Sequence, residues 1–361
     1  METVKGKYGC AHIFTDDIEE SAVNQIRNIM NDPVSEGSKV RVMPDVHPGK
    51  VGPIGLTMTV GDRVMPSLLG IDIGCGMLMA KVKTKTVEFT KLDKAIRKKI
   101  PAGFDIRTEP HTLADIDLMT KLYCVEHIDI DKCMRAIGTL GGGNHFIEMD
   151  KGSDSTYIII HSGSRRLGKE VTEYYMNKGR KDGVPYELTY LDGDLMKMYL
   201  HDVSVVQKYA SLNRKAMLQT ILKEMKWKAE EEFESIHNYI DESMILRKGS
   251  ISAGDGETVI IPINMRDGVI IGRGKGNPEW NYSAPHGSGR KLRRDMVKSV
   301  YTVSAFKKDM EGIYCTSISK ETLDEAPAAY RTIDEISERI SETVEITDIL
   351  KPIYNFKAEE S

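Results

Sequence analysis

The residues best suited to chemistry in this sequence are histidines, and they are unevenly distributed along the chain. Five of the nine stand in strings rich in Gly, Asp or Asn, the setting of a loop that presents a side chain: His47, His145, His161, His237 and His286. The other four have no such setting, and we expect them to be surface or packing residues: His12, His111, His127 and His201. The first five are therefore the candidates for a functional site.

Asp72 and Cys75 form the most specific short motif, because a carboxylate and a thiol stand three residues apart between glycines in GIDIGCGM. Side chains at this spacing in a tight loop can both turn toward one ion. Thiolate, imidazole and carboxylate ligands together suit a borderline divalent metal such as Mn, Zn or Co. A buried, small, hydrophobic Cys beside a turn Asp is the alternative. The further ligands that the sequence offers favour the metal site: His145, His161 and His237.

Two strings have the composition of anion-binding loops. Residues 141–143 are three glycines, and consecutive unhindered backbone N–H groups can form an anion nest. The string is neither a Walker nor a Rossmann motif, so a plain turn is its simpler interpretation. Residues 161–166, HSGSRR, close a predicted strand and open a predicted helix. Hydroxyls, guanidinium groups and helix N–H groups at such a junction bind anions.

His286 opens a similar string, PHGSGR at residues 285–290. Its imidazole could be a general acid, a metal ligand or a covalent nucleophile. A loop histidine whose ring is hydrogen-bonded for structural reasons is the alternative. All of these roles remain open from the residues alone.

Short strands and tight loops are expected to position these side chains. Residues 41–82 alternate short apolar runs with Gly and Pro, which is typical of strands joined by turns. The aromatic and β-branched run at residues 157–160 predicts a strand that delivers His161 at its end. Two further β-like runs, at residues 259–263 and 269–271, are separated by a turn.

Helices are expected in three segments. Residues 168–178 follow the strand at His161 and have a helical pattern. Residues 194–245 contain no Gly or Pro and repeat apolar residues every three to five positions, which predicts one or two long helices within about 194–247. Apolar spacing from Ile333 predicts a helix to about Leu350, which Lys351-Pro352 ends.

These elements predict a mixed α/β (α+β) fold, with residues 1–361 forming one domain around a deep cleft. No internal repeat or low-complexity linker divides the chain. The sequence has no run of about 18 apolar residues that could span a membrane, and no signal peptide is apparent at the N-terminus. Five cysteines, an odd number without CxxC spacing, fit a reducing compartment, so we expect a cytoplasmic protein.

The net charge of −4, from 50 basic and 54 acidic residues, excludes a uniformly basic nucleic-acid coat. Basic residues are nevertheless concentrated in two segments, 286–298 and 161–181, each with a net charge of +4. Residues 321–361 carry a net charge of −7, which offsets both segments in the net charge of the chain. We therefore expect a local grip on phosphorylated strand ends beside the candidate histidines.

Nine strings together resemble the RtcB family of GTP-dependent RNA ligases, and most closely its shorter bacterial type. They run in family order from Met43 to Lys357 and so cover nearly the whole chain: MPDVHPGK, GIDIGCGM, GTLGGGNHFIEM, HSGSRRLGKEV, HNYI, NMRDG, SAPHGSGR, DEAPAAYR and LKPIYNFK. Nine ordered strings are far more specific than any one of them. The resemblance implies a compact α/β fold peculiar to these ligases, with short glycine-rich strands and long helices around a deep metal-binding cleft.

Carried over motif by motif, the resemblance implies two Mn²⁺ ions per chain. Asp72, Cys75 and His145 would hold one of them. Cys75, His161 and His237 would hold the other, so that the ions share the Cys75 thiolate. Asp45 and His47 lie in the first matching string and would support the site from behind its ligands.

The resemblance also assigns His286, which falls where the family forms its covalent guanylyl-histidine from GTP. Asn144 would contact phosphate, Glu148 the guanine edge and Lys357 the guanine ring. The remaining contacts to GTP or GMP would come from Asn264, Arg266, Asp267, Ser283, Gly287 and Gly289. RNA phosphate would be bound by Arg165 and Arg290.

The implied activity joins RNA 3′-phosphate or 2′,3′-cyclic phosphate ends to 5′-hydroxyl ends, through the guanylyl-histidine and an activated RNA 3′-pp-G end. The alternative is a two-metal phosphohydrolase or cyclic phosphodiesterase acting on RNA ends, which needs no guanylyl acceptor. A non-catalytic RNA-end-binding module would require damaged metal ligands, and all five ligands are present. The expected partners are RNA and GTP and no membrane, and the sequence identifies no activating protein. Arg293 stands where a Ser is usual, which bears on the preference for phosphate ends.

Overall fold

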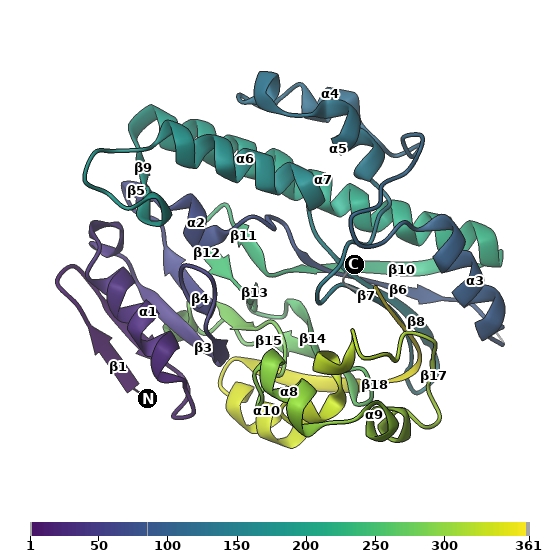
Figure 1. Cartoon of the computed structure of the whole chain (residues 1–361). Helices are drawn as coiled ribbons and strands as arrows, with labels where there is room; N and C mark the ends of the chain where they lie inside the picture. The colour runs from purple at the N-terminus through teal and green to yellow at the C-terminus, as the bar shows by residue number, and fades with distance from the viewer. Residues whose placement is uncertain (1, 85, 359–361) are drawn as a thin grey trace.

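The computed structural model describes residues 2–84 and 86–358 and arranges two large β-sheets beside a long helix (Figure 1). The strands are β1 (Glu2–Lys5), β2 (Cys10–Ile13), β3 (Val40–His47), β4 (Ile54–Thr59), β5 (Arg63–Val64), β6 (Gly76–Val82), β7 (Phe146–Lys151), β8 (Thr156–Ser162), β9 (Leu191–Asp192), β10 (Ala229–Ile236), β11 (Asn238–Ile240), β12 (Ile245–Lys248), β13 (Ser250–Ser252), β14 (Thr258–Asn264), β15 (Gly268–Gly274), β16 (Ser283–Pro285), β17 (Tyr314–Cys315) and β18 (Val344–Lys357). The helices are α1 (Glu20–Met30), α2 (Pro66–Leu69), α3 (Phe89–Lys99), α4 (Ile116–Met119), α5 (Ile130–Ala136), α6 (Arg165–Lys178), α7 (Gly193–Met225), α8 (Arg294–Val300), α9 (Val303–Asp309) and α10 (Ile333–Ile340). The predicted mixed α/β class is confirmed.

The smaller of the two sheets has the strand order β1-β2-β3-β4-β12-β11. Its strands pair antiparallel except for β2 and β3, which are parallel. The end of β3 carries Asp45 and His47, two residues apart and therefore on one face. Two short pairs, β13 with β16 and β5 with β9, complete the pairing. The predicted strands and tight loops of residues 41–82 are confirmed as β3 to β6, except that Pro66–Leu69 form the short helix α2.

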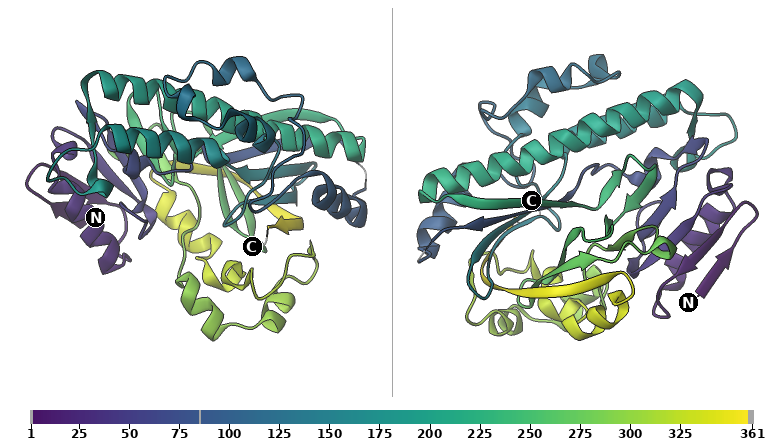
Figure 2. Two further views of the ribbon diagram at one scale, coloured as in Figure 1. Left: turned by 45° about the horizontal axis from the view of Figure 1, so that its top comes forward. Right: turned by 180° about the vertical axis from the view of Figure 1, so that it is seen from behind.

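The larger sheet has the order β10-β6-β8-β7-β18-β15-β14, with β17 also paired to β18. All of its pairs are antiparallel except β17 with β18. The strand β18 joins the two halves, because residues 344–350 pair with β15 and residues 351–357 pair with β7. Figure 2 shows this yellow strand curving along the sheet.

The two faces of the central strands β6, β8 and β7 have different partners. Leu78 and Ile160 pack in a cluster with residues of α3 and α7, whereas Met77 and Ile159 pack in a separate cluster. Because side chains alternate along a strand, His161 shares the face of Ile159 and points away from α7. Met77 lies directly opposite His161 in the register. Helices therefore cover one face of the sheet, and the other face is left for the site.

The helix α7 is shorter than the sequence predicts. Its residues 193–225 are helical, but Lys226 is left-handed with φ of 58° and residues 229–236 form β10. The prediction of helix to residue 245 is therefore wrong beyond Met225. A strand with three consecutive glutamates has little intrinsic β preference, but β10 is an edge strand whose glutamates face solvent. Pairing with β6 decides its conformation, and that information lies outside the segment.

The C-terminal prediction is also corrected. The helix α10 begins at Ile333 as expected but ends at Ile340, and residues 344–357 form β18. The spacing of Ile340 and Val344 imitates a continuing helix across a turn. Beyond the turn the chain adds a strand between β15 and β7, and the ladder contacts of 14 residues override local helix propensity.

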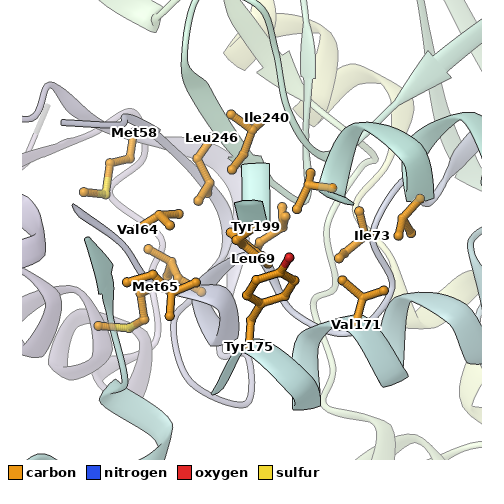
Figure 3. Close-up of a cluster of buried hydrophobic side chains, with 14 of the residues drawn as sticks. Met58, Val64, Met65, Leu69, Ile73, Val171, Tyr175, Tyr199, Ile240 and Leu246 are labelled. Carbon is orange, nitrogen blue, oxygen red and sulfur yellow. The ribbon is translucent and has the colours of Figure 1, made fainter. Parts of the chain in front are cut away.

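A large apolar cluster anchors the loop that carries Asp72 and Cys75. Ile73 is fully buried in this cluster, which also contains Val171 and Tyr175 of α6 and Tyr199 of α7 (Figure 3). Ile73 is therefore fixed in the core, and it fixes the backbone of the loop from which Asp72 and Cys75 project. Within residues 2–84 and 86–358, no helix is long and apolar enough to cross a membrane.

Candidate metal centre and nucleotide cavity

Two groups of three candidate ligands meet at Cys75. The ligand atoms of Asp72, Cys75 and His145 lie within 4.8 Å of one another, and so do those of Cys75, His161 and His237. The Cys75 Sγ atom lies 3.4 Å from Nε2 of His145 and 3.4 Å from Nε2 of His161. His145 Nε2 is 3.2 Å from Asp72 Oδ2, and the Nε2 atoms of His161 and His237 are 3.3 Å apart. The structure thus brings together five residues that are up to 165 positions apart in sequence.

The hydrogen bonds of the imidazoles show that this donor set fits cations. His145 Nδ1 donates to the carbonyl of Leu140 at 2.9 Å, and His161 Nδ1 donates to the carbonyl of Asn144 at 3.1 Å. In neutral rings, the two Nε2 atoms then present lone pairs to the sulfur of Cys75. A single thiol proton can satisfy one of these contacts only. A cation on each side of the sulfur would satisfy both, as in metal sites whose histidines are oriented by backbone carbonyls.

The electrostatics of the site agree with this interpretation. Burial, and after it the charges of nearby His145 and other cationic groups, lower the pKa of His161 well below its ordinary value, so its imidazole is neutral. Burial would raise the pKa of Asp72, but the hydrogen bonds and charges of its neighbours, His145 first and then Cys75 and Arg165, together outweigh burial and hold that pKa below its ordinary value. Burial and the charge of Asp72 raise the pKa of Cys75 far above the ordinary range. The thiolate therefore depends on positive charge beside it, which a bound divalent ion supplies.

Two glycines make room for the ligands. A Cβ on Gly163 would lie 2.1 Å from Asp72 Oδ1, so the residue after β8 must be Gly for the carboxylate to enter the site. A Cβ on Gly141, whose φ is 87°, would lie 1.8 Å from Arg165 Nη1 and 2.9 Å from His145 Nδ1. The triple glycine therefore has a steric role beside the metal ligands, whatever its backbone N–H groups bind.

Two buried polar residues of α7 hold the strand ends that carry the ligands, and the sequence reasoning missed both. Asn213 accepts from the backbone N–H groups of residues 138 and 139 and donates to Ser162 and Gly163. Arg214 Nη1 donates to the carbonyls of Gly74 at 2.7 Å and Ser162 at 2.8 Å. The available signal was an Asn-Arg pair inside an apolar helical repeat, because such residues are buried only when paired.

His286 lies at the other side of the cavity and has a buried carboxylate behind it. Its Nδ1 is 2.7 Å from Asp45 Oδ2, and Asp45 is fully buried. A proton on Nδ1 leaves Nε2 with its lone pair on the opposite side of the ring, which lines the cavity. The ring centroids of His286 and His237 are 4.9 Å apart, so the candidate nucleophile adjoins the metal centre.

His47 shares this surrounding. Its Nδ1 donates to the carbonyl of Asp45 at 3.0 Å, and its ring centroid lies 6.5 Å from that of His286. Burial lowers the pKa of His47 to about 4, so it is a neutral wall of the cavity. The resemblance implied only that Asp45 and His47 support the site from behind its ligands, and the structure places both beside His286.

A cavity of about 390 Å³ extends from these histidines, a volume within the range of small-ligand sites. Six of the residues predicted to bind the nucleotide line it: Asn144, Glu148, Asn264, Gly287, Gly289 and Lys357. Three others do not line it. Arg266 and Asp267 pair with each other at 2.9 Å on the β14–β15 turn, and Ser283 is buried with its hydroxyl bonded to Arg247 and Asn281.

The two arginines predicted to bind RNA phosphate are engaged with the protein. Arg165 Nη2 donates to the carbonyl of Gly103 at 2.7 Å, and this side chain is not part of the cavity wall. Arg290 lines the cavity, but its guanidinium donates to Tyr330 Oη at 2.8 Å and to the carbonyl of Asp324. The basic segment 286–298 is therefore partly neutralised by the acidic segment that follows it.

Glu148 and Asp150 form a buried carboxyl pair on the cavity face of β7. Burial, and then the charge and hydrogen bond of Asp150, raise the pKa of Glu148 well above its ordinary value. Burial raises the pKa of Asp150 to about 7. Glu148 also accepts from Asn355 Nδ2 of β18, whereas the Asp150 oxygens have no donor among the described residues. Each carboxyl therefore keeps its proton to a higher pH than an exposed carboxyl would.

Glu325 is the centre of a charge cluster at the far wall, and sequence reasoning gave it no role. Its carboxylate lies 2.7 Å from Lys357 Nζ and also binds Arg294 and the hydroxyl of Tyr330. Burial would raise the pKa of Glu325, but Lys357, Arg294 and Arg290 hold it well below the ordinary range. The string DEAPAAYR, which contains it, was the available signal.

These features define a class of protein: one whose candidate two-metal centre adjoins a nucleotide-sized cavity and a histidine backed by a buried carboxylate. A family model described as tRNA-splicing ligase RtcB matches residues 25–124 and 118–358. The chain therefore belongs to the RtcB family.

Individual relatives agree with the family match. The chain is 30% identical to the RNA-splicing ligase RtcB of Escherichia coli K12 over 366 residues, which cover 87% of this chain and 88% of the relative. It is 26% identical to the RNA-splicing ligase RtcB2 of another E. coli strain, with coverage of 88% and 86%. It is also 26% identical to the tRNA-splicing ligase RtcB of Nanoarchaeum equitans, with coverage of 88% and 87%.

Proposed function

We propose that this RtcB-family RNA ligase joins RNA 3′-phosphate or 2′,3′-cyclic phosphate ends to 5′-hydroxyl ends and uses GTP and Mn²⁺. We assign this activity to residues 1–361 as one domain. The observation that carries the proposal is the pair formed by His286 and the buried Asp45, 2.7 Å apart, at the junction of the metal centre and the cavity. A hydrolase needs no guanylyl acceptor, so guanylylation of His286 separates the two activities.

The candidate ligands fit two Mn²⁺ ions that share Cys75. Asp72, Cys75 and His145 would hold one ion, and Cys75, His161 and His237 the other. Such ions, when bound, supply Lewis acidity and neutralise charge on phosphates. The protein fixes the ligands through the backbone carbonyls behind His145 and His161 and through Arg214 behind the loop.

The nucleotide would lie between His286 and Glu148. Guanine presents two N–H donors on one edge, and a carboxylate that accepts both selects guanine over adenine. Glu148 lines the cavity and would present its carboxyl to that edge of guanine. Asn144 would contact phosphate, and Lys357 would lie against the ring.

His286 performs the first transfer. With its proton on Nδ1 held by Asp45, the Nε2 lone pair attacks the α-phosphorus of GTP, an N–P bond forms, and pyrophosphate leaves. The Asp45 carboxylate stabilises the positive charge that the ring acquires. An RNA 3′-phosphate oxygen then attacks the same phosphorus and the N–P bond breaks, which gives the RNA 3′-pp-G end. Attack by the 5′-hydroxyl on the RNA phosphate forms the phosphodiester and releases GMP.

Labelling with α-³²P-GTP and Mn²⁺ tests the first step. Wild-type protein should acquire an acid-labile label, and His286→Ala should acquire none while keeping its metal content. A matched control is His201→Ala, because His201 is exposed on α7 and bonds only a carbonyl among the contacts of the described chain. Loss of metal together with the label in His286→Ala would mean that His286 is a ligand, and no label in the wild type would refute the ligase proposal.

Oligonucleotides with defined ends test the overall reaction. Each of three donors, with a 3′-phosphate, a 2′,3′-cyclic phosphate or a 3′-hydroxyl, is paired with a 5′-hydroxyl or 5′-phosphate acceptor. We expect products only from the first two donors with the 5′-hydroxyl acceptor. Opening of the cyclic phosphate without guanylylation or joining would identify a phosphodiesterase instead.

A further inference from the structure

Phe104 is the most exposed of the large hydrophobic side chains in the described part of the chain, with 88% of its surface accessible. It does not sit on a loose segment. The N–H of Asp105 donates to the carbonyl of Ala102 at 3.2 Å, which closes a tight turn with Phe104 near its tip. The fold thus presents an aromatic ring to solvent on a fixed support, where it is free to stack on a ligand.

The turn that carries Phe104 is attached to the metal centre. Gly103 donates from its N–H to the carbonyl of Gly141 at 3.0 Å and accepts from Arg165 Nη2 at 2.7 Å. Gly141 in turn lies against the ring of His145, where a Cβ would come within 2.9 Å of Nδ1. Phe104 therefore directly follows Gly103, which is hydrogen-bonded to Gly141, and Gly141 lies against the candidate metal ligand His145.

A basic groove of about 700 Å³ runs along the C-terminal end of α7, and Arg107, three residues after Phe104, lines it. Its cations come from three segments of the chain: Lys99, Arg107, Lys223, Lys226 and Lys228. Glu224 is the acidic residue among its lining residues, and it lies 3.9 Å from Lys99. Arg107 follows Phe104 by three residues, so the groove begins within about 11 Å of chain from the ring.

Aromatic and weakly charged groups accompany the cations. Trp227 is half-buried in the groove wall. Burial, and then the charges of Arg107 and Lys223, lower the pKa of His111, which shows that both cations converge on this ring. Beyond Lys228 the chain presents the exposed glutamates of β10, so the basic strip has a definite end.

We propose that the turn of Phe104 and this groove bind the single-stranded RNA that leads away from the ligated end. Phe104 stacks on a base beside the metal centre, and the groove holds the phosphates of the following nucleotides. Fixed aromatic side chains combined with a cationic groove are the means by which proteins bind single strands without reading their sequence. The proposal rests on the proposed ligase function and adds the path of the substrate.

Phe104→Ala and Phe104→Trp test the stacking contact. The Michaelis constant for a 4-nucleotide RNA with a 3′-phosphate should rise about tenfold in the Ala variant and stay within about twofold of wild type in the Trp variant. The value of kcat should change less than the Michaelis constant, and guanylylation by GTP should not change. Equal behaviour of the two variants would overturn the stacking role.

Neutralisation of the groove tests the phosphate path. In the triple variant Lys223→Gln, Lys226→Gln and Lys228→Gln, a fluorescent 20-nucleotide RNA should bind about tenfold more weakly, and the slope of log Kd against log salt should fall by about 2. A 4-nucleotide RNA should bind as before. The matched control neutralises the same number of exposed lysines elsewhere on α7: Lys197, Lys208 and Lys215.

The outcomes separate this inference from the proposed function. Unchanged 20-nucleotide binding in the groove variant, or an equal loss in the control, would overturn the groove. Binding is measured by fluorescence anisotropy and needs no catalysis. If the wild type acquired no guanylyl label, the ligase function would fall while the anisotropy experiment still decided whether this surface binds RNA.

Discussion

The proton on His286 has one stable location, because a buried carboxylate faces Nδ1 at 2.7 Å. The lone pair is therefore kept on Nε2, where the nucleotide would lie. A nucleophilic imidazole needs this arrangement, since the wrong tautomer presents an N–H to the phosphorus. Asp45 is thus expected to act through His286 rather than on the substrate.

Asp45→Asn should slow guanylylation by about 100-fold or more, because the Asn amide can donate to Nδ1 and shift the ring proton to Nε2. The rate is measured with α-labelled GTP, and metal content should stay at the wild-type value. Asp62→Asn, a change of an exposed aspartate, provides a control of the same chemistry. Guanylylation at the wild-type rate in Asp45→Asn would contradict the tautomer argument.

Asp150 gives the protein a pH-dependent stability that is unusual in sign. The ordinary pKa of Asp is 3.8, and burial raises that of Asp150 to about 7. Between these values the folded protein holds a proton that the unfolded chain has released, so this group lowers the free energy of unfolding as pH rises. Its contribution is fully favourable below about pH 4 and is lost by about pH 7.

Asp150→Asn should remove the fall in the free energy of unfolding that Asp150 causes as pH rises. The free energy of unfolding of the variant minus that of wild type should grow between about pH 4 and 7, level off above, and reach a few kcal/mol. Urea denaturation in the presence of a chelator measures it. Asp154→Asn, on the exposed β7–β8 turn, should give a difference that does not vary with pH.

At the scale of elements, α7 serves as the support of the metal centre. Its residues Asn213 and Arg214 bond the ends of β8 and the loop before β6, and Arg214 also pairs with Glu234 of β10 at 3.1 Å. One buried guanidinium therefore links a helix, a metal loop and two strands. A helix with an apolar stripe alone would pack on the sheet but would leave these carbonyls without donors.

Arg214→Met should lower the free energy of unfolding by about 3 kcal/mol, because it leaves buried carbonyls and a carboxylate without their partner. Denaturant titration measures the change. Lys215→Met is the matched control, since Lys215 is the exposed neighbour on the same helix and its loss should cost less than about 0.5 kcal/mol. Equal effects of the two substitutions would contradict the supporting role of Arg214.

At the scale of the molecule, the distribution of charge differs from that expected from the sequence. The acidic C-terminal segment does more than offset the basic segments in the net charge of the chain. Its Asp324, Glu325 and Glu335 pair with the basic segment, through Arg294, Arg290 and Lys291. The cationic surface that remains beside the site is the groove at the end of α7, which the sequence did not single out.

Metal binding should stabilise the whole molecule, because the ligands come from loops and strands between residues 72 and 237. At a free Mn²⁺ concentration about 100 times Kd, each occupied site should add about 2.7 kcal/mol to the free energy of unfolding, and a chelator should remove this gain. Cys75→Ala should show almost none of it, since both sites share that residue. Two tightly bound ions in Cys75→Ala would refute the bridging role.

The sequence by itself determined the family. The order of nine strings sufficed for that, because reactive groups must be of particular types at particular spacings, and the same strings named the candidate ligands Asp72 and Cys75 that the structure brings together. Short strands such as β8 and β14 were also predictable, because alternation of side chains is a local signal.

Only the tertiary structure decided the ends of α7 and α10, the strands β10 and β18, and the partners of the arginines. Residues 229–236 become a strand because β6 offers a free edge, and residues 344–357 because β15 and β7 lie on either side. The same holds for Asp45 behind His286, 241 residues away. Pairing and burial depend on neighbours that are distant in sequence, and no local pattern encodes them.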